Sequence, residues 1–264
     1  MSNPFITEVL EQPRDPLGGA SGEKRRFTVE FLGKSNNASF PYTVANEVVA
    51  THLGIALGLN MPTVLTHTLA GNSFALIQMV NRDPSIQQSP PATARVFADY
   101  VASHPREVHG AIIFDLFVAN NDRAFGPERR NLMLDTDGQL LLYDQGNACF
   151  YRHRPGSGIV AGAPRLDAVE ADLSALFDMD HKGNHYREFL TSWELVDQWC
   201  ERIRALPEYV IESAVNRIPS QLSVPIDDER KRLIEFLVHR RRYLHDHIVR
   251  WKDRFPGLPD RERT

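Results

Sequence analysis

The stretch that decides the fold is FDLFVANNDRAFGPERRNLMLDTDGQLLLYDQGN, residues 114–147. It contains three apolar runs, and carboxylate or carboxamide side chains stand where these runs begin or end. The first run ends in Asn-Asn-Asp-Arg, the second begins at Asn131, and the third ends in Tyr-Asp-Gln-Gly. Any one of these residues alone is ordinary in a turn or at a strand end. Their order along one stretch of chain favours a chemical site.

The last two apolar runs predict a β-hairpin, because NLML and QLLLY flank Asp-Thr-Asp-Gly, a typical turn sequence. If the turn centres on Thr136 and Asp137, Asn131 lies opposite Leu142. Side chains alternate between the two faces of a strand, so Asp144 would share a face with Asn131. The two residues would be diagonal neighbours, roughly 7 Å apart at the backbone. We therefore expect room for a cation between them.

A third polar residue, Asp122, is joined to Asn131 by the loop 123–130. This loop is long enough for Asp122 to fold over the same end of the hairpin. Carboxylate and carboxamide oxygens are ligands that magnesium prefers, and a carboxylate can orient or deprotonate an attacking hydroxyl. The trio therefore predicts phosphoryl transfer, which relies on positioning and on neutralising the charge of phosphate.

The composition is that of an ordinary globular protein. Of 264 residues, 42% are hydrophobic and 24% are charged, and the formal net charge is -4. This balance does not suit a protein that coats nucleic acid or an anionic membrane. The two cysteines, Cys149 and Cys200, lack the spacing of a zinc site. Because the sequence shows neither a secretory signal pattern nor an apolar run of membrane-spanning length, we expect a cytoplasmic protein.

The pattern along the chain predicts two lobes. Residues 1–80 hold several strand-like runs and a helix at 45–57, which together make a small β-rich N-lobe. Residues 81–92 are rich in Pro, Ser and Gln and predict a connection. The second lobe, 81–264, is mainly helical apart from the hairpin. The predicted fold class is therefore α+β.

At these motifs the sequence resembles the HipA-like kinases, distant relatives of protein kinases and phosphatidylinositol kinases. Their catalytic segment runs from Phe-Asp through Asn-x-Asp-Arg and Asn-x-x-Leu to Asp-x-Gly. The matching segments here are Phe114-Asp115, Asn120 to Arg123, Asn131 to Leu134, and Asp144 to Gly146. Ala45-Asn46-Glu47 is similar to the Asn-Glu helix of the family. The resemblance covers most of the chain and implies a two-lobed protein-kinase-like fold that uses ATP and Mg²⁺.

Transferred residue by residue, the resemblance implies that Asp122 is the catalytic base and that Asn131 and Asp144 bind magnesium. Arg123 belongs to the same catalytic motif. The expected nucleotide-binding residues are Gly18, Gly19 and Ser21 in a glycine-rich loop, Lys34, Glu47, and Gln78 and Val80 at the connection. A plain turn explains the two adjacent glycines equally well. The implied acceptor is a Ser or Thr of a protein, and neither a nucleic-acid nor a membrane partner is expected.

One departure from the kinase pattern concerns the lysine that holds the nucleotide phosphates. Kinases carry it on the third strand of the small lobe and pair it with a helix Glu, for which Glu47 is the candidate. In RFTVEFL the expected position is occupied by Glu30, and a carboxylate there repels phosphate. Lys24 and Lys34 have the strand parity of Glu30, but Lys34 lies about 13 Å further along the strand. One of these lysines bends into the site, or neither does.

The sequence thus predicts an ATP- and Mg-dependent kinase that transfers the γ-phosphoryl group to a hydroxyl. One alternative is a degenerate pseudokinase with a regulatory or interaction role, which Glu30 supports. The other is a nucleic-acid-binding regulator that uses the arginine-rich last helix. That alternative requires one basic surface stripe formed by Arg129, Arg130, Arg152, Arg154 and Arg240 to Arg242.

Overall fold

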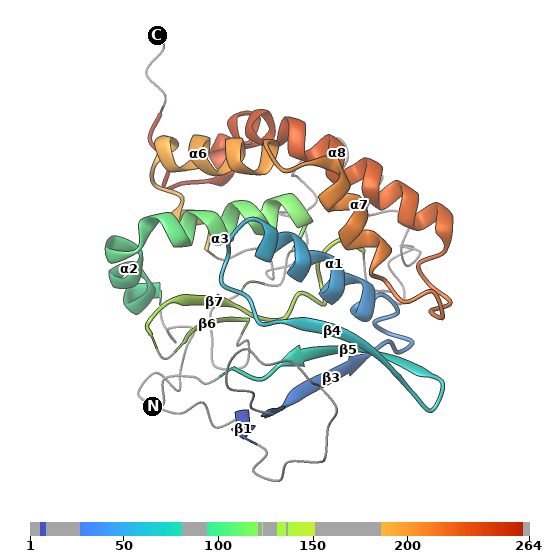
Figure 1. Cartoon of the computed structure of the whole chain (residues 1–264). Helices are drawn as coiled ribbons and strands as arrows, with labels where there is room; N and C mark the ends of the chain where they lie inside the picture. The colour runs from blue at the N-terminus through green and yellow to red at the C-terminus, as the bar shows by residue number, and fades with distance from the viewer. Residues whose placement is uncertain are drawn as a thin grey trace, which may run out of the picture.

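The N-terminal part of the chain consists of short antiparallel sheets and one helix (Figure 1). The computed structural model describes residues 6–8, 27–80, 94–120, 123, 131–135, 137–150 and 186–260. Strands β1 (Ile6–Glu8) and β2 (Phe27–Val29) pair with each other. A second sheet has the order β3-β5-β4, with β3 (Phe31–Ser35), β4 (Val64–Leu69) and β5 (Asn72–Gln78). Helix α1 (Thr43–Ala56) contacts all three of these strands.

The register of this second sheet decides which side chains face α1. Strands β4 and β5 are joined by Ala70-Gly71, and both residues have positive φ, 50° and 79°, as a tight hairpin turn requires. Along β5, Ala75 and Ile77 are buried while their neighbours are not. Lys34 on β3 pairs with Ala75. Because paired residues lie on the same side of a sheet, Lys34 shares the buried face.

The rest of the described chain is mainly helical. The helices are α2 (Ala94–Ser103), α3 (Pro105–Val118), α6 (Trp193–Arg204), α7 (Glu208–Asn216) and α8 (Asp227–Arg250), with short 3-10 turns η2 (Arg187–Phe189) and η3 (Lys252–Arg254). In Figure 1, α6, α7 and α8 lie on the side of α1 and α3 that is remote from the sheet. Within the described residues, no helix is both long and apolar enough to cross a bilayer.

The main hydrophobic core crosses the predicted lobe boundary. It joins buried residues of α1, such as Val49 and Leu53, to residues of α3, α6, α7 and α8. Helix α1 therefore packs against the helical part as well as against the sheet. The predicted lobes 1–80 and 81–264 stay a prediction, because the connection 81–92 lies outside the described residues.

The hairpin forms where it was predicted, with a register shifted by one residue. Strands β6 (Leu132–Leu134) and β7 (Leu140–Leu142) are antiparallel, and Leu132 pairs with Leu142. Asn131 therefore lies opposite Tyr143, whose N–H donates to the Asn131 carbonyl at 2.9 Å. The predicted pairing of Asn131 with Leu142 is wrong because the turn has three residues rather than two. Gly138, with φ 75°, closes the longer turn in the left-handed conformation.

A smaller apolar cluster joins the sheet to the hairpin. It contains Val44 and Val48 of α1, Ala75 and Ile77 of β5, and Leu141 and Tyr143 of the hairpin. The cluster holds the end of β7 against the buried face of the sheet. As a result, Asp144, the residue after Tyr143, emerges next to Lys34.

Candidate active site

Three charged side chains from three elements meet at the end of β7. The Lys34 ammonium on β3 lies 2.7 Å from Oε1 of Glu47 on α1 and 2.8 Å from Oδ1 of Asp144. Glu47 is buried, whereas the side chain of Asp144 is 37% exposed and that of Lys34 is 21% exposed. The site therefore has a closed side at α1 and an open side at Asp144.

The pKa values of the two carboxyl groups are shifted in opposite directions. Burial raises the pKa of Glu47 to about 7, although the Lys34 charge works against this shift. Burial also acts to raise the pKa of Asp144, but the Lys34 ammonium outweighs it and holds that pKa below its usual value. Burial lowers the pKa of Lys34, yet the two carboxylates more than compensate and the net shift is upward. Lys34 and Asp144 are therefore both charged at neutral pH.

Glu30 does not lie opposite Glu47, which corrects the sequence interpretation. The run that looked like one strand is divided at Glu30 into β2 and β3, and the Glu30 side chain is exposed. Its backbone carbonyl accepts a hydrogen bond from Met79 N–H at 3.0 Å. Since β3 continues to Ser35, Lys34 rather than Glu30 lies opposite Glu47.

Helix α1 holds the backbone that follows Asp144. The buried Asn46 carboxamide donates to the carbonyls of Gly146 and Phe150 at 2.8 and 3.0 Å, and it accepts from Phe150 N–H at 3.0 Å. Oε2 of Glu47 accepts from Gln145 N–H at 3.0 Å. Two neighbouring polar residues of a mostly apolar helix therefore fix the loop that carries Asp144.

Arg123 holds the hairpin from the other side. Its guanidinium is 1% exposed and lies 3.0 Å from the Asp115 carboxylate, which is also buried. It donates to the carbonyl oxygens of Asn131 and Tyr143 and, at 2.9 Å, to Oε1 of Gln145. A fully buried guanidinium with these partners does not face a substrate. We therefore correct its predicted role from catalytic residue to positioning residue.

Asp144 reaches the site by a route that the sequence argument did not foresee. With the observed register, strict alternation would put Asp144 on the face opposite to Asn131. Asp144 instead leaves the strand with φ 55°, and its Oδ1 accepts from Gly146 N–H at 3.2 Å. The structure thus brings the backbone of Asn131 next to Tyr143, while a shared ion between the Asn131 and Asp144 side chains stays a prediction.

The connection residues Gln78 and Val80 lie beside the hairpin. The Tyr143 hydroxyl donates to the Gln78 carbonyl at 3.4 Å, and Val80 packs against the small apolar cluster. These residues border the apolar surface next to Lys34. Other predicted site residues lie outside the described residues, so their placement stays a prediction; they are Gly18, Gly19, Ser21 and Asp122.

Asp144 has the properties of a ligand for a hard cation. It is a partly exposed carboxylate whose lowered pKa keeps it ionised. Among the described residues, no three His, Cys, Asp or Glu side chains form a ready-made metal cluster. Magnesium commonly binds through one or two protein oxygens and completes its shell with phosphate oxygens and water, so the available donors fit this ion.

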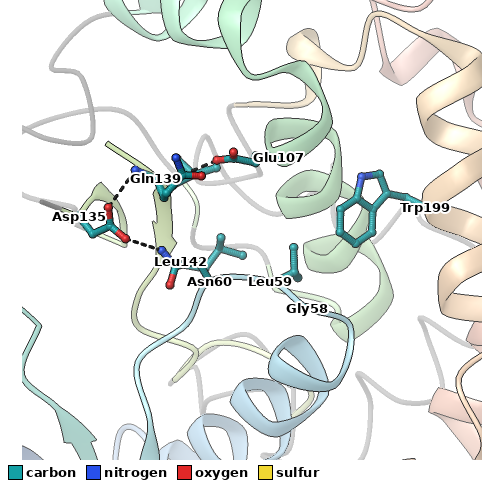
Figure 2. A pocket seen from close by; sticks show the side chains of 9 residues that line it. Gly58, Leu59, Asn60, Glu107, Asp135, Gln139, Leu142 and Trp199 are labelled. Carbon is teal, nitrogen blue, oxygen red and sulfur yellow. Dashed lines mark hydrogen bonds between the residues drawn. The ribbon is translucent and has the colours of Figure 1, made fainter. Parts of the chain in front are cut away.

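A cavity of about 400 Å³ lies at the opposite, turn end of the hairpin (Figure 2). Figure 2 shows Asp135 and Asn60 joined on one side of it, and Glu107 and Trp199 on the other. Oδ2 of Asp135 accepts from Asn60 Nδ2 at 2.8 Å. The residues that line this cavity do not include Lys34, so it is separate from the candidate active site.

No protein-family model and no curated protein sequence matches the chain. Among solved structures, the chain is similar to the proinflammatory kinase CtkA of Helicobacter pylori, with a TM-score of 0.51 and 15% identity over 93% of this chain and 97% of that chain. The chain has a kinase-like fold. The fold expected from the resemblance to HipA-like kinases is thereby confirmed.

The chain is also similar to a chain of the toxin–antitoxin complex of HipA, HipB and operator DNA from Shewanella oneidensis MR-1. That match has a TM-score of 0.47 and 15% identity, and it covers 92% of this chain and 68% of that chain. A likeness at this score carries no argument about function.

Three residues of the site were not assigned a role from the sequence. Asp115, Asn120 and Gln145 are buried polar residues that hold the hairpin through side-chain hydrogen bonds. A weak signal existed, since all three stand inside or next to apolar runs, where a polar side chain requires a partner. The sequence could not show which partner each one has.

Proposed function

We propose that this protein is an ATP- and Mg-dependent kinase that transfers the γ-phosphoryl group to a hydroxyl. One observation carries the proposal: Lys34 on β3 lies within hydrogen-bonding distance of both Glu47 on α1 and Asp144 at the end of β7. Phosphoryl transfer requires a cation for the nucleotide phosphates and a metal-binding carboxylate close to it. The kinase-like fold supports this chemistry only by analogy with other proteins of that fold.

Each residue has a defined task in this proposal. Lys34 binds phosphate oxygens of ATP, and Glu47 directs its ammonium. Asp144, together with Asn131, binds Mg²⁺, which neutralises charge on the transferred phosphoryl group. Asp122 accepts the proton of the attacking hydroxyl, as its place in the motif suggests. The bond between the γ-phosphorus and its bridging oxygen breaks, and the acceptor oxygen forms the new bond, so ADP leaves.

The proposal also names the group that receives the phosphoryl group. We take a Ser or Thr hydroxyl of a protein as the acceptor, because the sequence motifs resemble those of kinases with protein substrates. We also keep a cytoplasmic location as part of the proposal, since ATP is supplied there and a chain with two buried cysteines, Cys149 and Cys200, fits a reducing compartment.

Both alternatives have less support than they had from the sequence. The pseudokinase alternative depended on Glu30, which lies outside the site. The nucleic-acid alternative needed Arg240 on a basic surface stripe, but Arg240 is buried in α8. Arg129, Arg130, Arg152 and Arg154 lie outside the described residues.

The test is magnesium-dependent ATP binding and phosphate transfer by the purified chain, with Lys34→Met and Asp144→Ala as variants. Each variant should lower turnover by at least about 100-fold, because each removes a charge aimed at the transferred phosphate. Lys252→Met is the matched control: it removes an ammonium from the remote ion pair with Asp260 and should leave turnover unchanged. Absence of magnesium-dependent ATP binding in the unmodified chain would overturn the proposal.

A further inference from the structure

Gln145, the middle residue of the Asp-Gln-Gly motif, has a buried carboxamide that is bound from both sides. Gln145 is 1% exposed. Oε1 accepts from Asn120 Nδ2 at 3.1 Å and from Arg123 Nη2 at 2.9 Å. A carbonyl oxygen has two lone pairs, so both acceptor positions of Gln145 are used. Both donors belong to the segment that follows α3, since that helix ends at Val118.

Arg123 binds the chain on both sides of Asp144. One of its nitrogens donates to the Tyr143 carbonyl at 2.5 Å, and another donates to the Gln145 side chain. The backbone N–H of Gln145 is bound in addition by Glu47. Among residues 143–145, Asp144 is therefore the one that stays partly exposed, and both of its neighbours are held by hydrogen bonds.

This arrangement explains how Asp144 keeps an unfavourable backbone conformation. Its φ of 55° lies in the left-handed region. For a residue with a side chain this conformation is unfavourable and persists only where surrounding contacts enforce it. The contacts that enforce it include those of Tyr143 and Gln145, which fix the chain direction immediately before and after Asp144, in addition to the bond from Gly146 N–H to Asp144 Oδ1.

We propose that Gln145 is a positioning residue that holds Asp144 in its left-handed conformation and thereby sets the magnesium affinity of the site. The second half of this inference rests on the proposed kinase function. A Gln suits the position because its oxygen satisfies two buried donors at once. An apolar side chain of the same size would remove the buried oxygen to which Arg123 and Asn120 both donate, which would favour movement of the loop.

The first measurement needs no ligand. Amide hydrogen exchange of residues 143–147 is compared between the unmodified chain and Gln145→Met, which keeps the size of the side chain and removes its acceptor. We expect exchange in this segment to become at least tenfold faster. Gln145→Glu, which keeps both acceptor positions, should stay within about threefold of the unmodified chain. Equal exchange in the unmodified chain and Gln145→Met would overturn the positioning role.

The second measurement is a calorimetric titration of MgCl₂ into protein saturated with a non-hydrolysable ATP analogue. Gln145→Met should raise the half-saturating magnesium concentration at least tenfold, while binding of the analogue without metal changes less than threefold. Ile248→Ala in α8 is the control for general destabilisation, because Ile248 is buried in the core remote from the site. It should leave the half-saturating concentration unchanged.

The two measurements separate failure of this inference from failure of the proposed function. If the unmodified chain shows no magnesium-dependent binding, the kinase proposal is wrong, and the exchange result still decides whether Gln145 positions Asp144. If exchange increases in Gln145→Met but the half-saturating magnesium concentration does not, Gln145 does not set the metal affinity. A shift of equal size in Ile248→Ala would show that stability alone is responsible, which also contradicts the inference.

Discussion

The two ends of the β6–β7 hairpin are held by different kinds of contact. At the turn end, Oδ1 of Asp135 accepts from the N–H groups of Asp137 and Gln139, each at 2.9 Å, and most of the polar groups lie within a few residues of one another. At the Asp144 end, the partners come from α1, from β3 and from Arg123, which follows α3, and they are largely buried. The turn end is therefore held partly by local bonds within the turn and partly by Asn60, whereas the site end depends mainly on elements that are distant in the chain.

The largest difference between the two ends should appear when Arg123 is replaced. Arg123→Met removes the guanidinium that pairs with the buried Asp115 carboxylate, and it takes one donor away from each of three oxygen acceptors. We expect the free energy of unfolding to fall by about 3–5 kcal/mol, as for other buried ion pairs that lose one partner. Urea denaturation followed by circular dichroism measures this change. A loss below about 1 kcal/mol would show that the guanidinium does not hold the hairpin.

A second test uses pH and concerns Glu47. Its pKa is raised from 4.5 to about 7 in the folded protein, so the folded state binds more protons than the unfolded state between these pH values. The stabilising contribution is therefore complete below pH 4.5 and is lost as the pH rises to about 7.

Relative to Glu47→Gln, the unmodified chain should lose roughly 2–3 kcal/mol across this interval. The measurement is urea denaturation from pH 4.5 to pH 8 in EDTA and without nucleotide. Protonation of the histidines contributes equally to the free energy of unfolding of both proteins, so it cancels when one value is subtracted from the other. A difference that is constant with pH, or that grows in favour of the unmodified chain, would contradict the proposed protonation of Glu47.

Two asparagines make a matched pair for the next comparison. Asn46, at the site end, is buried and makes three hydrogen bonds to the backbone, whereas Asn60, at the turn end, is exposed and donates to Asp135. Asn46→Ala should reduce the free energy of unfolding by about 2 kcal/mol, because it leaves buried backbone groups unpaired. Asn60→Ala should cost less than about 0.5 kcal/mol. Similar losses in thermal denaturation of the two variants would remove the proposed distinction between the ends.

A modest effect, smaller than that of Asn46→Ala, is expected for Asp135→Ala. It removes the carboxylate that accepts three hydrogen bonds, but the donors are near water and can be solvated. We expect a loss of about 1 kcal/mol and no change in magnesium-dependent ATP binding. Denaturation and calorimetry of the same sample check both statements. A loss of ATP binding would show that the turn end contributes to the site.

The difference between local and long-range contacts also explains how much of the structure the sequence could predict. Period-two and period-3.6 patterns located α1 and the β6–β7 hairpin, because these are local features. The kinase-like fold followed from the order of the polar motifs. The hairpin register was missed by one residue, since Asp-Thr-Asp-Gly allows both a two-residue turn and the three-residue turn that Gly138 closes.

Within the site, Lys34 illustrates what a local pattern cannot supply. Parity along the strand made Lys34 a candidate, but the distance from Glu30 argued against it. The missing information was the break at Glu30 and the pairing of β3 with β5, which are long-range features. The partners of Asn46 and Gln145 likewise could not be predicted, because they lie 104 and 25 residues away in the chain, as the pairs with Phe150 and Asn120 show.

The pairing of Lys34 with Ala75 makes the site sensitive to the parity of strand length. Deleting or inserting one residue between Phe31 and Lys34 would turn the ammonium to the outer surface of the sheet, away from Glu47 and Asp144. A change of two residues would restore its direction and only move it along the strand. Engineering of this strand should therefore proceed in steps of two.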